Sequence, residues 1–136
     1  MGRHELREQI FKLLFRVEFN DIADMPEQVK LFLEDSESAV SEKDAAYIKE
    51  KYQKIQDLLP EIDKLIGNNT EKWDITRMGK VDLTVLRLAA YEILFDDDIP
   101  ASVAINEAVD IAKAYGQDNS GAFVNAILAK IVKLGD

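Results

Sequence analysis

One segment of the sequence restricts the possible fold more than any other. Residues 80–95 are apolar on nearly every side of a helix. The apolar side chains are Val81, Leu83, Val85, Leu86, Leu88, Ala89, Ile93 and Leu94. A helix without a polar face is stable only where other elements cover it all round. The segment therefore predicts a central helix inside a helical bundle.

Apolar side chains recur every three or four residues along most of the remaining chain, which is the spacing of one face of an α-helix. This spacing covers residues 6–17, 29–33, 45–59, 103–115 and 123–131. No alternating strand pattern, internal repeat or low-complexity tract accompanies it. The sequence therefore predicts an all-α fold, a helical bundle of six to seven helices.

Residues with special backbone preferences mark where these helices begin and end. Pro26 and Pro100 suit helix starts, because the first turn of a helix leaves its N–H groups unused and proline lacks one. Pro60 either kinks the helix predicted over residues 45–59 or restarts it. Gly116 is typical of a residue that ends a helix. Ser41 is typical of an N-cap, whose hydroxyl accepts a backbone N–H of the first turn.

Length and composition limit the class of protein. The 136 residues fit one domain, and the absence of cysteine excludes disulfides and thiolate chemistry, which fits a reducing cytosol. No apolar run approaches the roughly 20 residues that span a bilayer. Residues 1–16 also lack the apolar core of a signal peptide. We therefore expect a cytoplasmic protein that does not enter a membrane.

The sequence contains no recognisable enzyme motif. His4 is the single histidine, so no histidine-based metal cluster or catalytic triad can form, and no glycine-rich phosphate loop is present. The three aspartates at 96–98 are more typical of a solvated turn than of a Mg²⁺ site. Arg87 and Glu92 fit either a buried acid–base pair or two groups satisfied by structural partners, and the second is favoured because no polar cluster accompanies them. We expect no catalysis, cofactor or metal.

The charge is distributed unevenly along the chain. The formal net charge of −9 argues against bulk attraction to nucleic acid. Residues 1–16 nevertheless have a local excess of cations, with four Arg or Lys and two Glu. Arg3 and Arg7 lie one helical turn apart, so we expect them to share a face that is open to solvent or a ligand. Any nucleic-acid binding must then come from a local patch.

Five segments of the second half carry a family resemblance. They are Trp73–Lys80 (WDITRMGK), Leu86–Leu94 (LRLAAYEIL), Ile99–Val109 (IPASVAINEAV), Ala112–Gly116 (AKAYG) and Ser120–Leu128 (SGAFVNAIL). Together they resemble the NusB family of bacterial transcription antitermination factors. The resemblance implies an all-α fold of two packed helical subdomains, at about residues 1–68 and 69–136, within a single NusB-like domain.

The resemblance also implies a function and partners. Members of this family bind boxA-type single-stranded RNA of ribosomal RNA operons together with the ribosomal protein NusE. The pair joins an RNA polymerase complex that resists termination. We expect the same of this chain.

The resemblance places candidate RNA-binding residues at two positions in the sequence. The arginine-rich N-terminus of the family maps onto Arg3, His4 and Arg7. Arginine suits this role because its planar guanidinium binds phosphate and stacks on bases.

The second position is the loop that ends at Ser120 and the start of the last helix, where Asn119, Ser120 and Phe123 are the candidates. An aromatic ring can stack on a base, and a helix start presents amide donors to an anion. A structural role remains open for each: capping the helix for Asn119 and Ser120, and core packing for Phe123.

Three acidic residues are candidates for contact with a basic protein partner, namely Glu71, Glu92 and Asp110. Two other functions remain open. The chain could be a protein-interaction module with the same fold and weak or no RNA binding, or it could resemble the domain that precedes the catalytic domain of certain ribosomal RNA methyltransferases. A self-dimer that covers the RNA-binding face is a further possibility.

Overall fold

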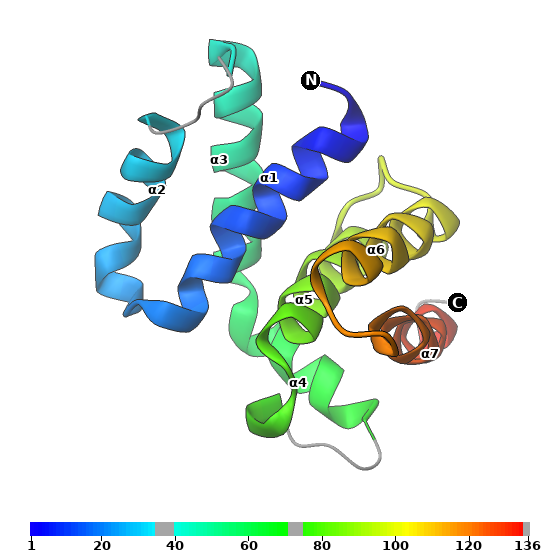
Figure 1. The fold of residues 1–136 in the computed structure, drawn as a ribbon. Coiled ribbons are helices and arrows are strands. Elements are labelled where there is room, and N and C mark those ends of the chain that lie inside the picture. Colours follow the sequence, from blue (N-terminus) through cyan, green and yellow to red (C-terminus); the bar gives the residue numbers. More distant parts are fainter. Residues whose placement is uncertain (35–39, 71–74, 135–136) are drawn as a thin grey trace. The chain divides into compact units, whose positions relative to one another are not determined.

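The computed structural model describes residues 1–34, 40–70 and 75–134 and contains, in these ranges, seven α-helices and no strand (Figure 1). The helices are α1 (Arg3–Phe15), α2 (Met25–Glu34), α3 (Glu42–Asp57), α4 (Leu59–Asn68), α5 (Lys80–Phe95), α6 (Ala101–Tyr115) and α7 (Ser120–Leu134). Three short 3₁₀ helices accompany them, η1 (Arg16–Phe19), η2 (Ile22–Asp24) and η3 (Ile75–Arg77). The predicted all-α fold is confirmed.

The chain divides into two compact units, Met1–Gln56 and Asp57–Asp136. The sequence-based division, at about residue 68, placed the α4 segment in the first part. In the structure α4 contacts α5 and belongs to the second unit. The break falls where α3 ends and α4 begins, and Pro60 lies in the first turn of α4.

The first unit contains α1, α2 and nearly all of α3. Its core consists of apolar side chains that are almost completely buried, including Ile10, Leu13, Leu14, Met25, Ile48 and Ile55. Pro26 is the second residue of α2, as predicted for a helix start. The hydroxyl of Ser41 accepts the N–H of Asp44 at 3.1 Å, so Ser41 is the N-cap of α3 as predicted.

The second unit is built around α5, which contacts α4, α6 and α7. Ten consecutive residues of this helix, from Leu83 to Glu92, are buried. The prediction of a central helix is therefore confirmed. Burial of one large aliphatic side chain contributes about 1.5–3 kcal/mol, so this helix accounts for much of the unit's stability.

Arg87 lies on α5 and forms a bidentate ion pair with Asp63 of α4. Its Nε and Nη2 atoms donate to Oδ1 and Oδ2 of Asp63 at 2.8 and 2.9 Å. The Arg87 side chain is 9% exposed and the Asp63 side chain 29% exposed. This pair supports the structural interpretation of Arg87, because the charge of its side chain is matched across two packed helices.

Within the described residues, none of the helices combines the length and the apolar character that crossing a bilayer requires.

Candidate functional site

The first turns of α1 contain three of the predicted RNA-binding residues, which differ in their exposure to solvent. Arg3 and His4 are exposed, whereas Arg7 is only 4% exposed. The expectation that Arg3 and Arg7 share an open face is wrong. Arg7 lies three, four and seven residues before Ile10, Phe11 and Leu14, so it belongs to the buried stripe of the helix.

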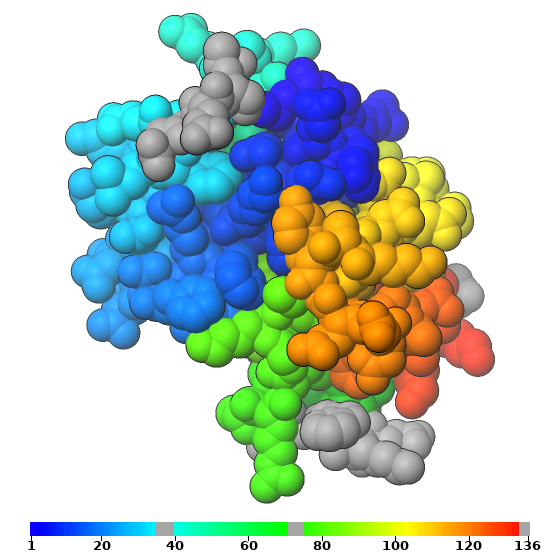
Figure 2. All heavy atoms as spheres, viewed as in Figure 1, coloured from blue at the N-terminus to red at the C-terminus, as the bar shows by residue number. Residues whose placement is uncertain are grey.

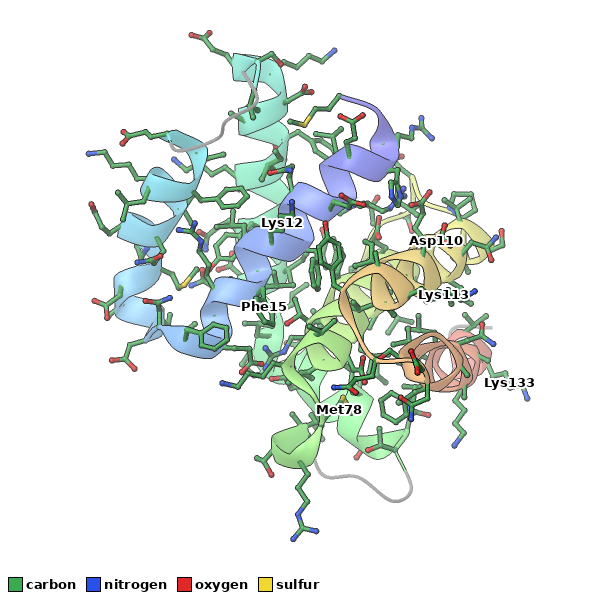
Figure 3. The ribbon with its side chains drawn as sticks, in the orientation of Figure 1. Lys12, Phe15, Met78, Asp110, Lys113 and Lys133 are labelled. Carbon is green, nitrogen blue, oxygen red and sulfur yellow. The ribbon has the colours of Figure 1, made fainter. Side chains whose placement is uncertain are left out.

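His4 is also engaged on the surface of α1. Its Nε2 atom lies 2.9 Å from Oε1 of Glu8, one turn further along the helix. The His4 side chain is 47% exposed, so it remains accessible from solvent despite this contact. Lys12 is a further exposed cation on this helix, labelled with Phe15 in Figure 3. Arg3, His4 and Lys12 thus place cationic or protonatable groups on the exposed part of α1.

The turn between α6 and α7 is organised around the Ser120 side chain. The Ser120 hydroxyl accepts the backbone N–H of Gln117 at 2.8 Å, and the Ser120 N–H donates to the Gln117 carbonyl at 3.0 Å. Ser120 is the first residue of α7 and is fully buried. Of the roles left open for Ser120, capping of α7 by its hydroxyl is therefore wrong, because the hydroxyl accepts an N–H that precedes the helix.

Gly116 is required at the end of α6 because the chain comes very close to itself there. A Cβ at this position would lie 2.5 Å from the Ser120 Oγ and 2.7 Å from the Ala112 carbonyl oxygen. Its φ of −99° is open to any residue, so steric contact alone requires glycine. Gly116 and Ser120 therefore serve to build the turn.

Asn119 and Phe123 are the accessible candidates in this region. Asn119 is exposed and its carbonyl accepts the N–H of Phe123 at 3.0 Å, while the Phe123 side chain is partly exposed. Gln117 and Asp118 are exposed in the same turn. Figure 2 shows this stretch, in orange, at the surface of its unit. The turn therefore offers two amides, a carboxylate and part of an aromatic ring to a ligand.

The three predicted partner-binding carboxylates have different positions. Glu71 lies outside the described residues, as does Trp73 of the family signature. Glu92 is 1% exposed, because it lies on the buried central helix, so its carboxylate is not part of the surface. Asp110 is exposed on α6, the helix that also carries Lys113 (Figure 3). Asp110 is thus the accessible member of this set within the described residues.

The described residues contain no group of three or more His, Asp or Glu side chains that could hold a metal ion.

Comparison with known proteins identifies relatives over almost the whole chain. The model of the NusB family matches residues 4–133. A transcription antitermination protein NusB from Agathobacter rectalis is 50% identical over 130 residues, covering 96% of this chain and 98% of the relative. A protein of the same name from Lachnoclostridium phytofermentans is 47% identical over 132 residues, covering 97% and 99%.

Solved structures show the same likeness. T. maritima NusB matches with a TM-score of 0.88 and 40% identity, covering 98% of this chain and 92% of that chain. A second structure contains the antitermination factors NusB and NusE in complex with double-stranded RNA. It matches with a TM-score of 0.84 and 26% identity, covering 98% and 99%.

Proposed function

The chain belongs to the NusB family, and from this membership we propose that it is an RNA-binding transcription antitermination factor. It binds boxA-type RNA of ribosomal RNA operons together with NusE and joins the RNA polymerase antitermination complex. The observation that carries this proposal is the nearly full-length match to a NusB chain crystallised with NusE and RNA. The role is one of binding rather than catalysis, and it is exercised where bacterial RNA is made, in the cytoplasm.

We assign the direct RNA contacts to the exposed candidates. Arg3 and His4 on α1 bind phosphate or splayed bases, and Asn119 and Phe123 on the second unit supply a polar group and a stacking surface. Arg7 acts by holding the packing of α1, because its side chain is buried. In the same way, Ser120 acts by shaping the turn that presents Asn119.

The charge of the chain supports a need for the protein partner. A net charge of −9 repels an RNA backbone, and few cations on α1 oppose that repulsion. Binding by the chain alone should therefore be modest and should fall steeply with salt. A basic partner such as a ribosomal protein supplies positive charge of its own. Asp110 is an exposed carboxylate suited to such a partner.

A titration of labelled boxA RNA, with and without NusE at low salt, tests the proposal. A scrambled RNA and a boxA duplex serve as comparisons, because the structural relative was crystallised with double-stranded RNA. We expect preference for single-stranded boxA over the scrambled RNA and a large gain in affinity with NusE. No binding in either condition would overturn the proposal.

A second function, a protein-interaction module with little RNA binding of its own, is favoured by one observation. Two of the six predicted RNA-binding side chains, Arg7 and Ser120, are buried. In this alternative, neutralising Arg3 leaves the affinity of the NusE complex for RNA unchanged. A several-fold loss on Arg3→Gln would exclude it.

A further inference from the structure

A pocket of about 430 Å³ lies between α2 and α3, the two helices drawn side by side in the first unit in Figure 1. One wall is apolar and comes from Pro26, Val29 and Leu33 of α2. The opposite wall comes from α3 and includes Tyr52. Its volume falls within the range of about 300–1,000 Å³ that is typical of small-molecule sites. None of its residues belongs to the proposed RNA contacts.

The Tyr52 side chain is unusual among the residues that line this pocket. It is 1% exposed, and its hydroxyl has no hydrogen-bond partner among the described residues. Buried hydroxyl groups nearly always have a partner, because an unsatisfied donor costs about 1–3 kcal/mol. Burial also raises the pKa of Tyr52 to about 12, so the hydroxyl keeps its proton even in moderate alkali. One residue of the lining therefore has a buried donor that lacks an acceptor among the described residues.

The charged residues around the pocket indicate the sign of a ligand. Lys30 comes from α2 and Lys49 from α3, so each helix contributes one lysine to the lining. Among the described residues that line the pocket, Glu34 is the single carboxylate, so their formal charges sum to +1 (two Lys against one Glu). The whole chain has a charge of −9, so this local excess stands out. An anion is therefore the ligand that the pocket electrostatically favours.

We propose that the pocket binds a small amphipathic anion. Its apolar body lies against Pro26, Val29 and Leu33, and its acidic headgroup accepts a hydrogen bond from Tyr52 and is attracted by Lys30 and Lys49. The Tyr52 hydroxyl lies beneath the accessible surface. The headgroup therefore reaches it only when long side chains of the lining, such as Gln53 and Gln56, turn aside.

Octyl compounds with different headgroups provide the test, because they share one apolar body. Octanoate, octyl phosphate and octylamine are titrated separately into the full chain, and binding is followed by amide NMR shifts. We expect both anions to shift the amides of α2 and α3 that line the pocket, and the stronger of the two identifies the preferred headgroup. Octylamine should bind at least tenfold more weakly. Equal binding of octylamine, or no saturable binding of either anion, overturns the proposal.

Variants separate the hydroxyl from the charges. Tyr52→Phe should weaken binding of the preferred anion about three- to tenfold. The double variant Lys30→Gln/Lys49→Gln should weaken it about two- to fivefold, with a smaller effect at high salt. Lys43→Gln is the matched control, because Lys43 is exposed on α3 but does not line the pocket. Unchanged affinity in both the Tyr52 and the lysine variants overturns the proposal.

The thermal stability of ligand-free Tyr52→Phe gives an independent readout. If the hydroxyl lacks a partner in the free protein, its removal should leave the melting temperature unchanged or raise it. A fall of several degrees in the melting temperature means that the hydroxyl already has a hydrogen-bond partner inside the free protein. This result overturns the proposal that it donates to a ligand. Should Tyr52→Phe fail to fold, that result likewise counts against the proposal, and the lysine variants still report on the charge contribution.

Discussion

The start of α1 and the turn between α6 and α7 differ in how far their candidate RNA-binding residues are constrained by packing. On α1, Arg3 and His4 are exposed on a helix that also carries a buried apolar stripe. In the turn, Ser120 is buried and Gly116 has no room for a side chain. Substitution on α1 should therefore change affinity with little effect on stability. Substitution of Gly116 or Ser120 should mainly lower the stability of the fold, and should change RNA affinity only as a consequence.

The five segments that carry the family resemblance all lie in the second unit, and the difference gives a physical reason for this. Segments such as AKAYG and SGAFVNAIL contain residues whose size is set by backbone contact and burial, including Gly116 and Ser120. Exposed residues such as Arg3 are less restricted by packing. A signature of this kind identifies the fold more directly than it identifies the binding residues.

The largest effect is expected from Arg87→Ala in the second unit. The change leaves the partly buried Asp63 carboxylate without its bidentate partner, and loss of one member of such a pair costs about 3 kcal/mol. Urea unfolding measures the free energy of unfolding. The double variant Arg87→Met/Asp63→Asn is the control and should recover part of the loss, since neither charge remains. A loss below about 1 kcal/mol for Arg87→Ala would show that the pair contributes little.

The first unit should be the more sensitive to alkali. The pKa of Tyr52 is raised from 10.0 to about 12 by burial, so the folded chain keeps a proton that the unfolded chain loses. The stabilisation is fully present below pH 10 and is lost as the pH rises towards 12, by at most about 2.7 kcal/mol. Urea unfolding at several pH values should show this fall in the wild type and a smaller one in Tyr52→Phe. The same fall in both proteins would contradict the assignment to Tyr52.

Gly116→Ala tests the steric requirement in the turn. The added methyl group would approach Ser120 Oγ and the Ala112 carbonyl, and such overpacking costs about 2 kcal/mol. Combining it with Ser120→Ala removes the contact with the hydroxyl but not the contact with the carbonyl, so the pair should be less destabilised than the sum of the single variants. If the urea midpoint of unfolding of Gly116→Ala equals that of the wild type, the steric requirement for glycine in this turn is contradicted.

Phe123→Leu asks whether the second unit contributes any direct RNA contact. Leucine keeps most of the apolar volume but cannot stack on a base, so affinity for boxA RNA with NusE present should fall about fivefold, or about 1 kcal/mol. Stability should change by less than about 1 kcal/mol, because Phe123 is only partly buried. Ala126→Ser, at an exposed position on the same helix, is the control. Unchanged affinity would assign Phe123 to packing alone.

Local signals in the sequence predicted the helices well. The apolar segment of α5 and the cap at Ser41 each depend on neighbouring residues, so they could be predicted without the structure. For Pro60 the sequence left a kink and a new helix start open, and in the structure α4 begins there. The Arg87–Asp63 pair joins residues 24 positions apart, and only the packing of α4 on α5 brings them together.

The site residues were harder to predict. Arg7 has the helical spacing of the buried stripe with Ile10 and Leu14, which indicates burial. Its charge instead led to the prediction that it is exposed. The Ser120 hydroxyl could accept a backbone N–H either from the first turn of α7 or from the preceding turn. Both donors lie within a few residues of Ser120, so the sequence alone does not distinguish them. The Tyr52 hydroxyl could not be found from sequence, because its lack of a partner depends on two packed helices.

The most direct test of the account is the salt dependence of boxA RNA binding by the chain with NusE, measured for the wild type and for Arg3→Gln. Lys43→Gln, an exposed position on α3, is the control. The wild type should bind at low salt, and Arg3→Gln should bind several-fold more weakly with a salt slope reduced by about 0.7, the value for one phosphate contact on single-stranded RNA. Failure of the wild type to bind boxA RNA, or identical slopes for the wild type and Arg3→Gln, would contradict the account.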